Sequence, residues 1–293
     1  MDGKVQTISE ISRRITEMLG AGWPAWEAAA LASAILQEYT GMGRAAQMAF
    51  GDRVPDNDAA ARIEDAAVRA AAGEPLQYIF GYTEFCAHRI EVEPGVLIPR
   101  PETEEMTLMI IGENGGFDGA VTDLCTGSGC IAIALALALP GAAVTATDLS
   151  DQALAVALRN TRQTGATLNL VRADVLNDDP AHVPMSGIIV SNPPYVTCRE
   201  KAVMHRNVLG HEPHEALFVP DEDPLLYYRA IAAVAEKRLL PGGTLWLEVN
   251  ENHAGETSSL FALSLYSQVR VIRDIRGKER FVKAQKRADC KSF

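Results

Sequence analysis

The first quarter of the chain has its apolar residues at helical spacing. Residues 8–19 place apolar side chains three and four positions apart, which predicts an amphipathic helix. An alanine-rich stretch over residues 24–39 begins at a proline, and residues 56–73 begin with Asp-Asn and end at a glycine, which are favourable helix boundaries. Because the connections are short, residues 1–75 are expected to form a small antiparallel helical bundle.

The pattern changes to an extended one over residues 76–99. Residues 77–85 and 88–92 are rich in aromatic and β-branched side chains, with turn-forming residues between them. The simplest account is a β-hairpin that links the helical bundle to the rest of the chain.

From residue 100 onward, strand and helix patterns alternate. A helix is expected after Thr103, and helical patterns separate the first five of seven short apolar runs. This alternation is typical of an α/β fold with a mostly parallel, doubly wound, Rossmann-like sheet over residues 100–293. The predicted strands are residues 120–124, 143–148, 169–172, 188–191, 243–249, 269–273 and 280–284.

Composition narrows the classes of function. The formal net charge of −11 disfavours sequence-independent binding to nucleic acid. No apolar run approaches the roughly 20 residues of a membrane span. Residues 1–5 lack the charged-then-apolar layout of a secretory signal, so a cytoplasmic protein without membrane contact is expected.

Cysteine and histidine spacing predicts neither disulfides nor a metal site. The five cysteines include no C-x-x-C pair, so they are expected to be reduced thiols. His205, His211 and His214 lie in a predicted loop without the strand or helix spacing that zinc ligands need.

A glycine-rich loop at residues 125–129 lies between the first predicted strand and the helix after it. Glycines let a ligand approach the backbone closely, and a helix N-terminus offers free N–H groups. Asp148 ends the second strand, where a carboxylate accepts hydrogen bonds from ribose hydroxyls. Since residues 127–132 also satisfy the G-x-G-x-x-A pattern, this loop alone leaves a nicotinamide cofactor and S-adenosylmethionine both open.

The octet at residues 188–195, Ile-Ile-Val-Ser-Asn-Pro-Pro-Tyr, ends the fourth strand. Two prolines stop the strand, so Asn192 lies at its carboxyl end, where open α/β sheets bind their ligands. Proline fixes φ and has no N–H, so Pro193 and Pro194 form a stiff bend. This hook presents the Asn192 side-chain oxygen and the Pro193 carbonyl as acceptors beside the ring of Tyr195, which suits a planar NH2 group.

In combination these segments resemble the class I S-adenosylmethionine methyltransferases. The glycine loop follows strand one, Asp148 ends strand two, Asp174 follows strand three and the Asn-Pro-Pro-Tyr hook ends strand four, as in the amino-methylating branch. Three further segments are similar to the glutamine methyltransferases of peptide chain release factors, the HemK/PrmC family. They are residues 96–104 (Val-Leu-Ile-Pro-Arg-Pro-Glu-Thr-Glu), 212–217 (Glu-Pro-His-Glu-Ala-Leu) and 274–281 (Asp-Ile-Arg-Gly-Lys-Glu-Arg-Phe).

The resemblance implies methyl transfer from S-adenosylmethionine to the side-chain amide nitrogen of the glutamine in the Gly-Gly-Gln motif of peptide chain release factors. It also implies that residues 1–75 recognise the protein substrate, that residues 76–99 are a linker and that residues 100–293 carry the methyltransferase; a monomer is expected. A ribosomal-protein glutamine methyltransferase stays open, although Pro-Glu-Thr-Glu at residues 101–104 favours the release-factor branch. An adenine-amino DNA methyltransferase fits the hook but not the acidic charge, and a nicotinamide oxidoreductase leaves the hook unexplained.

The same resemblance implies a set of site residues. Asn192 and Pro193 would each accept one N–H of the substrate glutamine, and Tyr195 would pack against its amide plane. The catalytic residues would be Asn192, Pro193 and Tyr195, and the substrate would contact Asn192, Pro193, Pro194, Tyr195, Arg100 and Glu212. The cofactor would contact Cys125, Thr126, Gly127, Ser128, Gly129, Asp148, Asp174, Val175 and Asn192.

Two residues depart from the family pattern. Cys125 stands where a glycine is common, so its backbone is expected to avoid positive φ. Val175 stands where many members have Trp or Phe beside the adenine, and it would bind the adenine ring less tightly than an aromatic side chain. For Arg100 and Glu212, an ion pair at a domain junction is an equal alternative to substrate contact.

Overall fold

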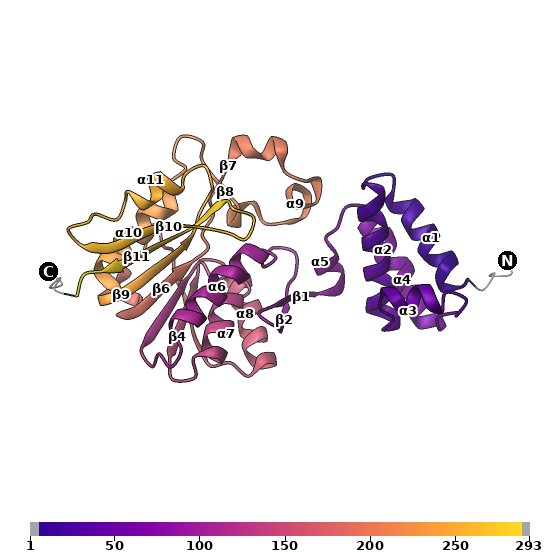
Figure 1. Cartoon of the computed structure of the whole chain (residues 1–293), viewed down its shortest axis with the longest axis horizontal. Coiled ribbons are helices and arrows are strands. Elements are labelled where there is room, and N and C mark those ends of the chain that lie inside the picture. Colours follow the sequence, from indigo (N-terminus) through magenta and orange to yellow (C-terminus); the bar gives the residue numbers. More distant parts are fainter. Residues whose placement is uncertain (1–5, 289–293) are drawn as a thin grey trace. The chain divides into compact units, whose positions relative to one another are not determined.

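The computed structural model describes residues 6–288 (Figure 1). The expectations for residues 1–5 and for Cys290 lie outside the described residues. By their internal contacts the residues form two compact units, Met1–Gly81 with His205–His211, and Tyr82–Met204 with Glu212–Phe293.

Helices build the first unit. A capping box between Thr7 and Glu10 begins α1, and α1, α2 and α4 bury a shared apolar core that includes Ile15, Ile35 and Ile63. The short helix α3 was not expected and occupies the segment after Gly43. The helices are α1 (Ile8–Leu19), α2 (Ala25–Thr40), α3 (Arg44–Ala49), α4 (Asn57–Ala71), α5 (Leu76–Phe80) and α9 (Arg206–His211).

Two sequence-based expectations are wrong in this unit. Residues 77–80, predicted as extended, belong to helix α5, because Pro75 starts a helical turn that Gly81, with φ 79°, ends. The segment predicted as a histidine-containing loop includes helix α9. The ring of His205 stacks on Trp23 with centroids 4.6 Å apart, so this segment packs as part of the helical unit.

A hairpin of β1 (Tyr82–Phe85) and β2 (His88–Glu91) opens the second unit. Cys86 and Ala87 form its turn with φ of 49° and 61°, the positive values that tight two-residue turns require. The hairpin expected here is therefore present, but it starts later than predicted.

The second unit is built on a seven-stranded sheet in the order β10-β11-β9-β6-β3-β4-β5. Strands β9, β6, β3, β4 and β5 pair in parallel, and β11 pairs antiparallel with both β9 and β10. The predicted doubly wound sheet is confirmed. The strands are β3 (Ala120–Leu124), β4 (Ala143–Asp148), β5 (Leu168–Arg172), β6 (Ser186–Ser191), β9 (Leu239–Glu248), β10 (Tyr266–Arg273) and β11 (Glu279–Lys286).

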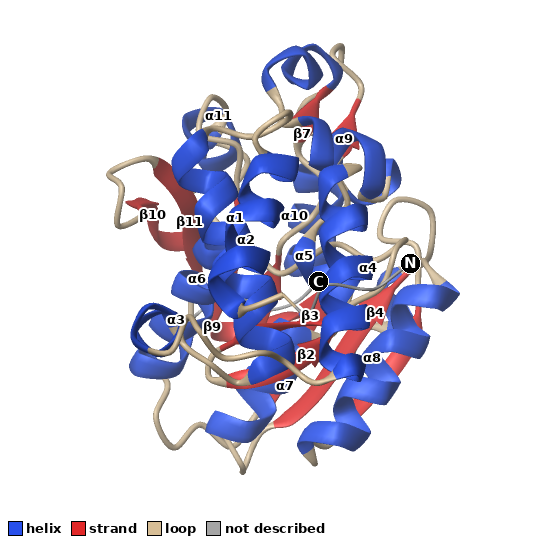
Figure 2. Ribbon diagram, turned by 90° about the vertical axis from the view of Figure 1, so that its right-hand side faces the viewer, coloured by secondary structure: helices blue, strands red, loops and turns tan. Residues whose placement is uncertain are grey.

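Helices cover both faces of this sheet (Figure 2). Successive residues of a strand point to opposite faces, so Ile188 and Val190 of β6 join one apolar cluster and Ile189 joins the other. The first cluster includes α6 and α7, and the second includes α10 and α11. The helices of this unit are α6 (Pro101–Glu113), α7 (Cys130–Ala138), α8 (Asp151–Thr164), α10 (Leu226–Arg238) and α11 (Ala254–Ser258).

Between the hook and α10, the second unit carries two short strands, β7 (Val196–Thr197) and β8 (Phe218–Val219), which pair in parallel. The backbone N–H groups of Tyr195 and Val196 donate to the Leu217 carbonyl at 3.2 and 2.9 Å. These bonds tie the end of the hook to residues 213–220. Over residues 6–288, none of the helices is both long and apolar enough to cross a membrane.

Candidate functional site

A cavity of about 580 Å³ lies in the second unit, at the carboxyl ends of β3, β4, β5 and β6. Its size is within the range of roughly 300–1,000 Å³ that small-molecule sites occupy. The wall includes the glycine loop, Asp148, Asp174 and Asn192. Segments widely separated in the sequence therefore meet where open α/β sheets bind ligands.

The glycine loop turns the chain from β3 into α7. Thr126, Gly127 and Ser128 line the cavity, whereas Gly129 lies behind it. Gly129 has φ 82°, and a Cβ built on it would lie 3.0 Å from the Cβ of Ala157, so close packing of α8 requires glycine there. Its role is thus to bring α7 and α8 together rather than to line the pocket.

Cys125 lines the cavity with φ 60°, so the expectation that its backbone avoids positive φ is wrong. A left-handed conformation costs a non-glycine residue roughly 1–2 kcal/mol. The turn imposes it, because Thr126 must place its N–H 2.9 Å from the Thr147 carbonyl of β4. Burial raises the pKa of the Cys125 thiol, which keeps it neutral.

Asp148 ends β4 with both carboxylate oxygens oriented by backbone donors. Gly127 N–H donates to Oδ2 at 2.8 Å and Ser150 N–H donates to Oδ1 at 2.9 Å. Burial raises the pKa of Asp148, and these bonds oppose the rise. Because each oxygen keeps a second lone pair, the carboxylate is able to accept a pair of hydroxyl groups in the cavity.

Asp174 follows β5 and lines the same cavity. Its oxygens accept hydrogen bonds from Leu176 N–H and Asn177 Nδ2, both at 2.8 Å. Val175 also lines the wall, next to the apolar cluster under α10.

An aromatic residue that the sequence did not single out faces this region. Tyr227, in the first turn of α10, lines the cavity with Leu149 and Leu226. Burial raises the pKa of its phenol, and the charge of Asp174 adds to the rise. The wall therefore presents the aromatic rings of Tyr227 and Phe218 in addition to Val175, which suits a planar base.

Asp123 lies directly beneath the glycine loop and was also missed. It is fully buried, and Thr126 Oγ1 donates to its Oδ2 at 2.5 Å. Its Oδ1 atom has no hydrogen-bond partner among the described residues. Burial raises the pKa of Asp123 to about 7. Asp123 is the fourth residue of β3, and the sequence pattern did not indicate that its carboxyl would be fully buried with one oxygen unpartnered.

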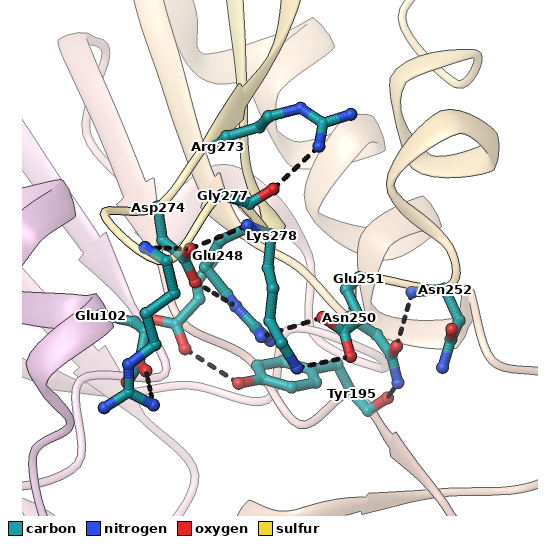
Figure 3. Close-up of polar contacts among 12 residues, drawn as sticks. Glu102, Tyr195, Glu248, Asn250, Glu251, Asn252, Arg273, Asp274, Gly277 and Lys278 are labelled. Atoms are coloured by element: carbon teal, nitrogen blue, oxygen red, sulfur yellow. Dashed lines mark hydrogen bonds and ion pairs between the residues drawn. The ribbon is translucent and has the colours of Figure 1, made fainter.

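The hook places its residues in two different surroundings. Asn192 and Pro194 line the cavity, whereas Pro193 is buried between them and Tyr195 lies behind the wall. The Tyr195 hydroxyl donates to Oε1 of Glu248 at 2.9 Å, and its carbonyl accepts from Asn250 Nδ2 at 3.3 Å (Figure 3). The structure thus anchors Tyr195 to the end of β9.

Arg100 and Glu212 form an ion pair at 2.7 Å. The Glu212 side chain is 1% exposed and also accepts from Ile98 N–H at 3.4 Å. Neither residue lines the cavity. Both lie in the second unit, where the pair joins the segment before α6 to the Pro213–Ala216 wall.

The three histidines belong to two different units. His205 and His211 belong to the helical unit, and His214 lies edge-on to Phe218 in the other unit. Among residues 6–288, no three His, Cys, Asp or Glu side chains are grouped so as to hold a metal ion. The four cysteines in this range are free thiols.

Two family models match the chain. Residues 105–215 match the methyltransferase small domain, and residues 20–81 match the PrmC N-terminal domain. The first match includes the glycine loop, Asp148, Asp174 and the hook.

Curated relatives extend the similarity to nearly the whole chain. The release factor glutamine methyltransferase of Bacteroides thetaiotaomicron is 46% identical over 224 residues, covering 76% of this chain and 80% of that protein. The one from Bordetella pertussis is 40% identical over 262 residues, covering 88% and 94%. A solved methyltransferase structure from Pyrococcus furiosus is 19% identical, covers 79% of this chain and all of that one, and superposes with a TM-score of 0.50, which supports the fold.

Proposed function

Since the chain belongs to the release factor glutamine methyltransferase family, we propose that Asn192 positions the glutamine of a release factor's Gly-Gly-Gln motif for methylation on its amide nitrogen. The observation that carries this proposal is the place of Asn192. It borders the cavity at the end of β6, and its Nδ2 is held 2.9 Å from Thr103 Oγ1. The Oδ1 atom is thereby left to accept a hydrogen bond from a substrate.

The residues around the cavity fit S-adenosylmethionine as the cofactor. Asp148 would hold the ribose hydroxyls, and Val175 and Tyr227 would flank the adenine. Thr126, Gly127 and Ser128 would bring backbone groups close to the amino-acid part. When bound, the cofactor supplies an electrophilic methyl group on a positively charged sulfur.

The protein contributes to the reaction by positioning the substrate amide and by stabilising the charge that develops on its nitrogen. A side-chain amide nitrogen is a poor nucleophile because its lone pair is delocalised into the carbonyl. Asn192 Oδ1 and the Pro193 carbonyl would each accept one N–H, which fixes the nitrogen and turns the face of the amide toward the cofactor. Two acceptors also stabilise the positive charge that develops on the nitrogen during transfer. The nitrogen then releases its proton to water, so no dedicated base is required.

Asn192→Ala tests this role. We expect kcat to fall by about 10²- to 10³-fold, the effect of removing one positioned polar group. The dissociation constant for S-adenosylmethionine, measured by calorimetry, should change much less. Asn169→Ala, at an exposed position of β5, is the matched control and should keep full activity. Turnover near the wild-type rate in Asn192→Ala would refute the assignment.

The substrate is tested with labelled S-adenosylmethionine and three acceptors. Label should enter a release factor, should fail to enter one whose Gly-Gly-Gln glutamine is replaced by alanine, and should not enter DNA. Transfer to a ribosomal protein instead would support the related glutamine methyltransferase.

We also propose that residues 1–75 recognise the protein substrate. Trp26 has a side chain that is 73% exposed. Trp26→Ala should therefore raise KM for the intact release factor and should not raise it for a short glutamine peptide.

A further inference from the structure

A chain of hydrogen bonds runs from Asn192 to the end of β9. Asn192 Nδ2 donates to Thr103 Oγ1 at 2.9 Å, and Thr103 Oγ1 donates to Glu248 Oε2 at 2.6 Å. Thr103 and Glu248 are 2% and 1% exposed, so the bond between these two residues is shielded from water. The other Glu248 oxygen accepts from the Tyr195 hydroxyl, as Figure 3 shows. Both oxygens of the carboxylate are therefore engaged by hydroxyl protons.

The sheet brings these groups together. Ser191 of β6 is in register with Leu247 of β9, so Asn192, which follows β6, and Glu248, the last residue of β9, lie side by side. Thr103 reaches them from the first turn of α6. Each of the three residues comes from a different element, and their contact depends on the strand order.

The number of protons decides which way the Asn192 amide faces. A threonine hydroxyl has one proton, and Glu248 takes it, so only lone pairs of Oγ1 remain for Asn192. The amide must then turn its NH2 group toward Thr103 and its oxygen away from it. An amide and its flipped form have nearly the same shape, so packing alone would not select between them.

The geometry points to Thr103 and Glu248 as positioning residues that lock the Asn192 side chain with its oxygen available to the substrate NH2 group. This inference rests on the proposed function of Asn192 and deepens it. Glu248 acts at a distance, by fixing the direction of the Thr103 proton. The device gives the enzyme preference for glutamine over glutamate, because an acceptor oxygen attracts NH2 and repels a carboxylate.

Glu248→Gln should reverse the donor and acceptor roles along this chain of hydrogen bonds, while the shape of the side chain at position 248 stays almost the same. The Tyr195 hydroxyl would donate to the new amide oxygen, and the new NH2 group would donate to Thr103. The Thr103 proton would then turn to Asn192, capture its oxygen and leave its NH2 group facing the substrate. A misdirected group of this kind typically costs about 10²-fold in rate.

The test compares Glu248→Gln, Thr103→Val and Thr103→Ser in the full-length protein. We expect kcat to fall about 100-fold in Glu248→Gln and about 10-fold in Thr103→Val, while Thr103→Ser, which keeps the hydroxyl, stays within about 3-fold of wild type. Affinity for S-adenosylmethionine should stay within about 3-fold in all three, because none of the substitutions changes Asp148, Tyr227 or the glycine loop. Thermal unfolding of each variant shows that it is folded.

A second measurement separates orientation from general damage. Wild-type enzyme should bind a release factor with Gly-Gly-Gln more tightly than one with Gly-Gly-Glu, and Glu248→Gln should shift this affinity ratio at least 10-fold toward glutamate. If Glu248→Gln weakened binding of the two release factors equally, the inference would be overturned. It would also be overturned if Thr103→Val and Glu248→Gln kept the wild-type kcat while Asn192→Ala was inactive. Both results would leave the proposed function intact. Full activity in Asn192→Ala would instead remove the proposed function itself.

Discussion

Asp123→Asn should remove a pH-dependent penalty on folding. Asp123 is fully buried beneath the glycine loop, one of its oxygens has no partner among the described residues, and burial raises its pKa from 3.8 to about 7. Asparagine has nearly the same shape and no charge. The Thr126 hydroxyl is still able to donate to an oxygen at position 123.

The direction in which stability changes with pH follows from the raised pKa of Asp123. Below pH 4 the carboxyl is protonated in both the folded and the unfolded protein, so the penalty is absent. Between pH 4 and pH 7 the unfolded chain has lost the proton and the folded protein retains it, so stability falls as pH rises. Three pKa units at 1.36 kcal/mol each set the full penalty at about 4 kcal/mol, reached above pH 7. From pH 5 to pH 8 the wild type should lose about 3 kcal/mol relative to the variant.

Urea unfolding at several pH values measures this difference. Glu248, whose pKa burial also raises, is present in both proteins and cancels in the comparison. Asp118→Asn, at an exposed position, is the matched control for loss of one charge. Parallel stability curves for wild type and Asp123→Asn across this range would show that Asp123 is not the strained carboxyl described here.

Three further outcomes follow from the cavity and its supports. Tyr227→Ala should weaken S-adenosylmethionine binding about 10-fold in calorimetry, since stacking on a base is worth roughly 1–3 kcal/mol; unchanged affinity would place the adenine elsewhere. Cys125→Gly should change the free energy of unfolding by less than about 1 kcal/mol, while Cys125→Val should lower it by about 2 kcal/mol because φ is 60°; equal effects would contradict a left-handed backbone. Arg100→Ala should destabilise by about 3 kcal/mol by stranding the buried Glu212 carboxylate, and adding Glu212→Gln should restore part of this loss, whereas additive losses would argue against the ion pair.

The fold was largely predictable because its strands are short apolar runs that end at informative residues. The glycine loop and the Asn-Pro-Pro-Tyr hook each mark the end of a strand, and parallel strands place such ends at one edge. What the pattern did not contain was the order of the strands. Glu248 therefore gave no signal, because its contact with Asn192 depends on β9 lying next to β6.

The errors have local physical causes. Residues 77–80 carry aromatic and β-branched side chains that favour strands, yet Pro75 and Gly81 bound a helical turn there, and burial of Tyr78 and Ile79 stabilises it. Cys125 was expected to avoid positive φ on intrinsic preference alone. The hydrogen bond from Thr126 to β4 overrides that preference.

The helical unit is discontinuous along the chain, because His205–His211 belong to it although they follow the hook in sequence. Cutting the protein after Gly81 would therefore not yield two self-sufficient pieces. The larger fragment would keep His205–His211 without the helices that these residues pack against. His205 would lose its stacking contact with the indole of Trp23. A chimera that joins the helical unit to another methyltransferase domain must therefore also include His205–His211.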